Sequence, residues 1–148
     1  MIWLLLLNAT FSCIMSGVIW FVQVVHYPLL GSVDANGFIE YQKQHVRRTG
    51  NLVGPLMMIE IVASISLAVG NICDSITYLI WLNLGILLFI WFSTFLIQIP
   101  LHNKLLLGFD KEVHRRLVQG NWLRTLAWTV KMILSLILIK KCYDGCYF

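Results

Sequence analysis

Four long apolar runs constrain the fold of this chain more than any other feature. They cover roughly residues 2–25, 52–69, 76–99 and 121–139. A helix of about 20 apolar residues crosses a bilayer. Hydrophobic residues make up 59% of the chain and charged residues 12%, whereas about 25% of residues are charged in a soluble domain. We therefore predict an all-α fold, a four-helix transmembrane bundle that forms one integral membrane domain over 1–148.

Lys and Arg are unevenly placed, and their placement predicts the orientation. None precedes Lys43, so the first run lacks the basic n-region of a signal peptide and is expected to be retained as a helix. Most of them lie in the two segments that join the first run to the second and the third to the fourth: Lys43, Arg47, Arg48, Lys104, Lys111, Arg115 and Arg116. The positive-inside rule places this face in the cytoplasm and both termini outside, in an inner or plasma membrane. The basic side chains then face lipid headgroups, and no nucleic-acid partner is expected.

The two basic junctions also resemble each other. Segments 20–51 and 91–121 share, in the same order, a Trp-Phe pair, a proline, a histidine before two arginines, and Gly-Asn. We predict an internal repeat of two parallel helical hairpins, about 1–72 and 73–141, followed by a short tail over 142–148. All the histidines lie within the two copies: His26, His45, His102 and His114.

Two prolines predict helix boundaries. The residue before a proline is pushed out of helical geometry, so the first helix is expected to stop near His26–Tyr27. A loop should follow over 31–37, and residues 38–49 should form a short helix in the membrane interface. The second span should begin near Leu52 with Pro55 in its first turn, where proline is tolerated.

Polar side chains follow one face of three predicted helices, at helical spacing. They are Trp20, Gln23 and either His26 or Tyr27 at the end of the first run, Trp91, Thr94, Gln98 and His102 in the third, and Asn121, Arg124, Trp128 and Lys131 in the fourth. The second run carries Glu60. This pattern predicts a bundle with a polar interior in the half nearest the basic junctions. Trp91 and Trp128 could line a pocket for a flat ligand, or simply pack in the core.

The charged residues inside the apolar runs are the costliest in the chain. A charge at the bilayer centre costs at least ~2.5–3.5 kcal/mol, so Glu60, Arg124 and Lys131 should face the interior and find partners. Glu60 is a candidate proton carrier or metal ligand, and Arg124 a candidate anion-binding group. The alternative is a buried pair of Glu60 with Arg124 or Lys131 that only sets the helix register. For Lys131 we favour a structural role.

Histidines are candidate ligands for a transition metal or haem. His26 and His102 stand at the ends of the polar stripes and are the better candidates, whereas His45 and His114 are expected to face water at the interface. The chain has no closely spaced metal-binding motif such as HExxH. A metal, a haem and no cofactor therefore all remain open, as does pairing of Cys142 with Cys146 or of either with Cys73.

Two short segments of the second hairpin match motifs of a known family. Pro100, Leu101, Asn103 and Leu105 match a Val-Pro-Leu-Asn-Asn-x-Leu motif that follows the third helix of that family, with His102 in place of Asn. Asn121, Arg124 and Thr125 match a Trp-x-x-x-Asn-x-x-Arg-Thr motif that opens its fourth helix, with Leu117 in place of Trp. Over the second hairpin the chain thus resembles the small four-span membrane proteins grouped with fungal anthrone oxygenases. This resemblance implies a four-helix membrane fold and oxygenation of a flat polycyclic phenol without an obvious cofactor.

Together these features favour a membrane-embedded redox enzyme, oxygenase-like, that acts on a lipophilic aromatic or quinone-like substrate from the cytoplasmic leaflet. Proton-handling groups would be Glu60, His102 and His26. Substrate-binding groups would be Arg124, Asn121, Trp91, Trp128, Gln98 and Gln23. A small proton-coupled transporter or channel is the first alternative, since an intramembrane carboxylate suits it. A membrane assembly factor, in which polar stripes only join helices, is the second.

Overall fold

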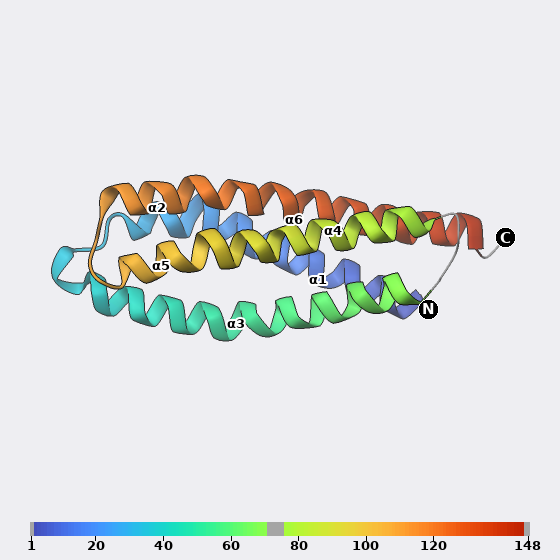
Figure 1. The fold of residues 1–148 in the computed structure, drawn as a ribbon, viewed down its shortest axis with the longest axis horizontal. Helices are drawn as coiled ribbons and strands as arrows, with labels where there is room; N and C mark the ends of the chain where they lie inside the picture. Colours follow the sequence, from blue (N-terminus) through green and yellow to red (C-terminus); the bar gives the residue numbers. More distant parts are fainter. Residues whose placement is uncertain (1, 71–75, 147–148) are drawn as a thin grey trace.

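The structure is a computed structural model that describes residues 2–70 and 76–146. Within these residues the chain is helical and contains no strand. Its elements are α1 (Ile2–Phe21), η1 (Val22–His26), α2 (Tyr27–Leu30), α3 (Ala35–Val69), α4 (Thr77–Ser93), η3 (Thr94–Gln98), α5 (Ile99–Leu105) and α6 (Lys111–Cys146). They form four apolar segments long enough to cross a membrane, which lie side by side (Figure 1). The predicted four-helix transmembrane bundle is confirmed.

The first and third segments continue through their prolines. Each passes through one π-helical stretch, in which the N–H of Tyr27 donates to the carbonyl of Val22 and the N–H of Ile99 to that of Thr94. Pro28 is the next residue after Tyr27, and Pro100 is the next residue after Ile99. A proline inside an α-helix loses a hydrogen bond and clashes with the carbonyl four residues earlier, and the wider π turn relieves this conflict. The predicted end of the first helix near His26–Tyr27 is therefore wrong, because the helix continues to Leu30.

The second segment is one helix rather than two. Residues 38–49 form no separate interfacial helix but belong to the first turns of α3, and Pro55 lies inside α3 rather than in a first turn. Phe38 explains the difference, since its side chain is fully buried against Leu105 and Leu117. This contact attaches the start of α3 to the bundle and outweighs the small helix propensity cost of Gly50 and its neighbours. Similarly, α6 continues to Cys146, so most of the expected tail is helical.

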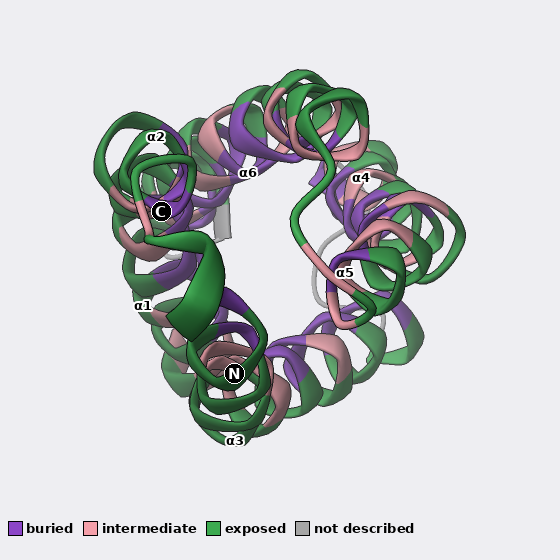
Figure 2. Cartoon of the chain, turned by 90° about the vertical axis from the view of Figure 1, so that its left-hand side faces the viewer, coloured by how far each residue is buried: buried purple, intermediate pink, exposed green. Residues whose placement is uncertain are grey.

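The bundle has a square cross-section (Figure 2). Helix α1 packs against α3 and α6, and α4 packs against the same two helices. We call the end that holds the connections 31–34 and 106–110 the histidine end. There His114 contacts the first residue of α2, since its Nε2 lies 2.8 Å from the carbonyl oxygen of Tyr27. A Cβ added at Gly31 would lie 3.0 Å from the His114 ring, so a larger residue in this turn would require that ring to shift by a few tenths of an ångström.

Apolar clusters occupy both ends of the bundle. The cluster far from the histidine end includes Leu5, Leu67, Leu138 and Cys142. Cys142 is buried and forms no disulfide with another described residue, while the structure of Cys73 and the side chain of Cys146 lie outside the described residues. The middle of the bundle is different, since buried polar side chains from all four segments meet there.

Candidate functional site

An ion pair lies at the centre of this polar region. Lys131 Nζ is 3.0 Å from Glu60 Oε1, and both side chains are fully buried. Lys131 also donates to Ser12 Oγ at 2.8 Å, while the indole N–H of Trp128 donates to Glu60 Oε2 at 3.2 Å. Lys131 therefore does not reach toward a membrane surface. Both charges are neutralised by each other and by hydrogen bonds, which is what low-dielectric burial requires.

Neutral polar side chains extend this network across all four segments. Asn8 on α1 donates to Ser64 on α3 at 2.6 Å. Asn83 on α4 donates to Ser135 on α6 at 2.9 Å, and Ser135 donates to Asn8 Oδ1 at 2.9 Å. We call these residues, with Ser12, Glu60 and Lys131, the central network. Sequence reasoning missed Asn8 and Asn83, although a lone Asn within an apolar run is itself a signal of interhelical hydrogen bonding.

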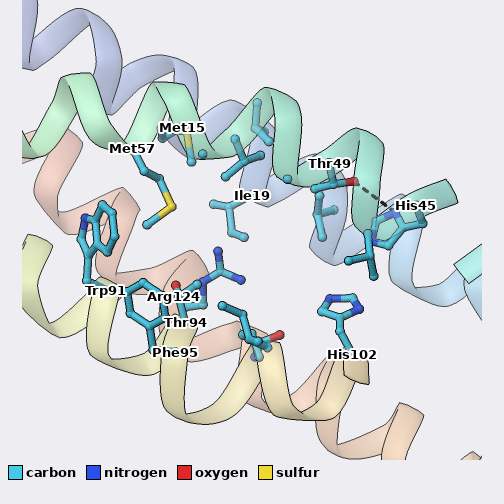
Figure 3. Close-up of a pocket in the computed structure, with 18 of the residues that line it drawn as sticks. Met15, Ile19, His45, Thr49, Met57, Trp91, Thr94, Phe95, His102 and Arg124 are labelled. Atoms are coloured by element: carbon cyan, nitrogen blue, oxygen red, sulfur yellow. Dashed lines mark hydrogen bonds between the residues drawn. The ribbon is translucent and has the colours of Figure 1, made fainter. Parts of the chain in front are cut away.

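A cavity of about 380 Å³ lies between the central network and the histidine end (Figure 3). All four segments contribute to its wall. The wall is largely apolar and includes Met15, Ile19, Met57, Trp91 and Phe95. Small-molecule sites have this size and this character, with a few polar groups that orient the ligand. The polar groups in this wall therefore indicate which ligand the cavity suits.

Arg124 is the only Lys or Arg among the residues that line this cavity. Its side chain comes from α6 and projects between α1 and η3 in Figure 3, and the residue is 7% exposed. One guanidinium nitrogen donates to Asn121 Oδ1 at 3.1 Å, and the group lies 5.2 Å from the Trp128 ring centroid. Its Nε has no hydrogen-bond partner among the described residues, and no carboxylate of that part of the chain pairs with the guanidinium. Arg124 is thus a buried cation without a counterion in that part of the chain.

Two other cavity-lining donors lack partners among the described residues. They are the indole N–H of Trp91 and the amide nitrogen of Gln98. An unsatisfied buried donor costs about 1–3 kcal/mol, and such groups are rare in folded proteins. Trp91 also lies beside Phe95, with ring centroids 5.4 Å apart. The cavity therefore combines aromatic faces with donors that need acceptors.

His102 lies at the histidine end of the cavity, in a chain of hydrogen bonds. The amide nitrogen of Gln42 is 3.0 Å from His102 Nδ1, and His102 Nε2 is 3.0 Å from the Tyr27 hydroxyl. Because an amide NH₂ group can only donate, Nδ1 accepts and Nε2 carries the proton. The Tyr27 hydroxyl then donates to Gln98 Oε1 at 3.4 Å. This chain sets the tautomer of His102 and leads from Gln42 into the cavity wall.

Three histidine rings lie next to one another at this chain of hydrogen bonds. His26 and His45 are stacked with ring centroids 4.3 Å apart, whereas His45 and His102 are tilted by 36° with centroids 5.3 Å apart. Both nitrogens of His102 already have protein partners. No group of three metal-binding side chains converges in the described part of the chain. His45 contacts both His26 and His102, and the assignment of these two as metal or haem ligands stays a prediction.

The predicted site residues lie in four different places. The cavity is lined by His102, Arg124, Trp91 and Gln98. Glu60 and Trp128 belong to the contacts of the central network. Asn121 and Gln23 lie behind Arg124, where Asn121 donates to Gln23 Oε1 at 2.9 Å. His26 lines a different, outer groove.

Sequence reasoning missed Gln42 and His45 at this site and named Tyr27 only as an alternative to His26 on the polar face of the first helix. Tyr27 was expected at a helix end, and the other two belong to the segment expected to lie in the interface. The i, i+3 spacing of Gln42 and His45 was the available signal, since it puts both on one helical face. No family model, curated protein or solved structure matches the chain. The chemistry of the cavity therefore has to carry the functional assignment.

Proposed function

We propose that this integral membrane protein binds a flat, lipophilic aromatic or quinone-like molecule in the cavity and acts on it as a membrane-embedded oxidoreductase. The observation that carries the proposal is Arg124, a buried cation that lines an apolar cavity and has no counterion in the described part of the chain. Such a group favours an oxygen that bears negative charge, because charge-assisted hydrogen bonds are the strong ones.

The cavity suits this ligand in shape and polarity. Trp91 and Phe95 offer ring faces to a flat ring system. The guanidinium of Arg124 and the amide of Gln98 belong to residues that line the cavity, and both groups can donate to the oxygens of that ring system. When a quinone is reduced or a phenol loses its proton, negative charge grows on these oxygens. Preorganised donors in a water-poor site stabilise that charge, so the same contacts that bind the molecule would also favour its reaction.

Proton transfer is assigned to His102 and Tyr27. His102 lines the cavity and donates to the Tyr27 hydroxyl, which also lines it. A hydroxyl and an imidazole in direct hydrogen bond can pass a proton between a ligand oxygen and the histidine end. Glu60 receives a structural role in this proposal, because it is paired with Lys131 and does not line the cavity.

Two further features concern the origin of the two hairpins and the orientation of the bundle in the membrane. We propose that the two hairpins are an internal repeat, supported by the π-helical stretch that precedes the proline in both the first and the third segment. The basic residues at the histidine end support a cytoplasmic location for that end. The resemblance to anthrone oxygenases agrees with a flat phenolic substrate, since Arg124 and His102 lie within or beside the matching motifs and both line the cavity.

The alternative functions fit the contacts less well. A transporter that uses Glu60 as proton carrier needs that carboxylate to reach the cavity, but Ser12, Lys131 and Trp128 enclose it with hydrogen bonds. An assembly factor accounts for the central network, since hydrogen bonds between helices hold bundles together. It does not account for the unpartnered donors of the cavity wall in the described part of the chain.

Filling the cavity tests whether it is the binding site. Gly54 lies in the cavity wall, and a Cβ added there meets no atom within 4 Å. We expect Gly54→Leu to fold normally and to weaken the binding of menadione, a naphthoquinone without a tail, by about tenfold or more because it occupies apolar space. Quenching of tryptophan fluorescence in phosphatidylcholine nanodiscs measures this affinity.

Gly85→Leu is the matched control. Gly85 is likewise a helical glycine with open space around it, but it lies in α4 away from the cavity wall. It should leave the affinity for menadione unchanged. Equal affinities for the Gly54 variant and the control, or no binding by the unmodified protein, would reject the proposed site.

Oxidoreductase activity needs a separate measurement. Protein extracted in mild detergent should be examined by optical spectroscopy and metal analysis, which report any chromophore or metal that copurifies. An oxygen electrode should then record consumption of dioxygen with a flat polycyclic phenol. Binding without any turnover would leave a binding protein and reject the oxidoreductase.

A further inference from the structure

A second hollow lies directly outside the cavity. This outer groove has a volume of about 380 Å³ and runs between the first segment and α3. It shares five wall residues with the inner cavity: Val18, Val22, His45, Thr49 and Val53. Only one layer of side chains therefore separates the two spaces.

The outer groove opens toward lipid. Its remaining wall residues include Phe21 and Leu52, which are 60% and 59% exposed on helices apolar enough to span a membrane. Gly17 leaves additional room, because a Cβ added there meets no atom within 4 Å. Hydrocarbon is the surrounding solvent for such a surface.

The path of the first segment explains the groove. Near the middle of the bundle α1 contacts α3, as the hydrogen bonds from Asn8 to Ser64 and from Ser12 to Glu60 show. Toward the histidine end the first segment moves away from α3, and η1 packs against α6 instead (Figure 1). The space between η1 and α3 is consequently closed by side chains rather than by close helix packing.

The stacked rings of His26 and His45 lie where side chains separate the two spaces. His26 and His45 line the outer groove, and His45 and His102 line the cavity. His45 thus belongs to both spaces, and its Nδ1 is 3.2 Å from Thr49 Oγ1, which also lines both. The other shared wall residues are valines. Rotamer changes of a few such side chains are fast, so a connection between the two spaces can open here without movement of a helix.

We propose that the ligand of the cavity has a single long hydrocarbon tail, and that this tail leaves the cavity between η1 and α3 and lies in the outer groove. The inference rests on the proposed function, which supplies the oxygen-bearing ring. The ligand class is then a lipid-soluble quinone or phenol with a prenyl or alkyl tail, taken directly from the bilayer. The valine wall and the lipid-facing groove suit hydrocarbon, while the unpartnered polar donors described above belong to the cavity.

The test compares two naphthoquinones with the same ring, menadione without a tail and phylloquinone with a phytyl tail. The protein is placed in phosphatidylcholine nanodiscs, and affinities are measured at equal mole fractions of quinone in the lipid. Gly17→Leu fills the outer groove, and Gly85→Leu is again the control. We expect Gly17→Leu to weaken phylloquinone binding about tenfold and to leave menadione binding unchanged.

A second variant changes the opposite wall of the outer groove. Leu52→Trp on α3 enlarges an exposed side chain of the groove that does not line the cavity. It should have the same selective effect. If Gly17→Leu and Leu52→Trp affect both quinones equally or neither of them, the tail does not lie in the groove and the inference is overturned. If the unmodified protein binds neither quinone, the proposed function itself fails.

Discussion

Glu60→Gln and Lys131→Met should each destabilise the bundle by about 3–5 kcal/mol, because each leaves an uncompensated charge in a fully buried position. The double variant should cost clearly less than the sum of the two, since it removes both charges together. The amide introduced at position 60 can still accept from one of Ser12 and Trp128, which donate to different oxygens of the carboxylate in the unmodified protein. A double-mutant cycle on unfolding in detergent measures this coupling.

The control is Lys140→Met, which removes an exposed lysine from the same helix. It should change the free energy of unfolding by at most about 0.5 kcal/mol. The double variant should also keep its affinity for menadione, because neither partner lines the cavity. Additive costs in the cycle would show that the pair does not stabilise the central network as a unit. Loss of menadione binding in a folded double variant would place Glu60 or Lys131 in the site.

Arg124→Met should lower ligand affinity but not stability, whereas the Glu60 and Lys131 variants should lower stability. We expect it to weaken binding of a quinone by about tenfold to a hundredfold, the range expected for loss of a hydrogen bond to a charged group. Stability should stay the same or increase, because the substitution removes a buried cation that has no counterion in the described part of the protein. Affinity and unfolding should be measured on the same nanodisc and detergent preparations. A residue kept for function at the expense of stability behaves in this way.

Two comparisons sharpen this result. Arg47→Met removes an exposed arginine at the same end of the bundle and should affect neither quantity. Arg124→Lys keeps the charge but loses the planar fork of donors, so it should bind more weakly than the unmodified protein and more tightly than Arg124→Met. A large loss of stability in Arg124→Met, with unchanged binding, would make Arg124 a structural residue and contradict the proposal.

The number and type of helices could be predicted from the sequence, but their ends could not. Apolar runs of membrane-spanning length are a local property of the sequence. Inside a lipid bilayer only α-helices and closed β-barrels satisfy the hydrogen bonds of the backbone. Helix ends depend on more distant contacts. Pro28 is a typical signal for the end of a helix, yet the helix continues past it because a π turn precedes the proline. Phe38 was expected to begin an interfacial helix, yet its burial joins that stretch to the second span.

The site was predicted in part for the same reason. Arg124, Trp91, Gln98 and His102 follow from helical spacing, because each stripe belongs to one helix face. The partners of charged residues do not follow from spacing. Glu60 had two possible cations, and only the packing of α3 against its neighbours shows that Lys131 pairs with it and Arg124 does not.

The sequence by itself determined that this protein is a helical bundle in a membrane with its polar side chains turned inward. Apolar runs of about 20 residues are long enough to cross a bilayer as helices, and charged side chains in hydrocarbon need partners in the bundle interior. Only the tertiary structure decided which of the buried charges are satisfied. Lys131 and Glu60 neutralise each other in the central network, while Arg124 lines a cavity with its Nε free of protein partners in the described residues. Relative depth and rotation of neighbouring helices set these distances, and no single stretch of sequence encodes them.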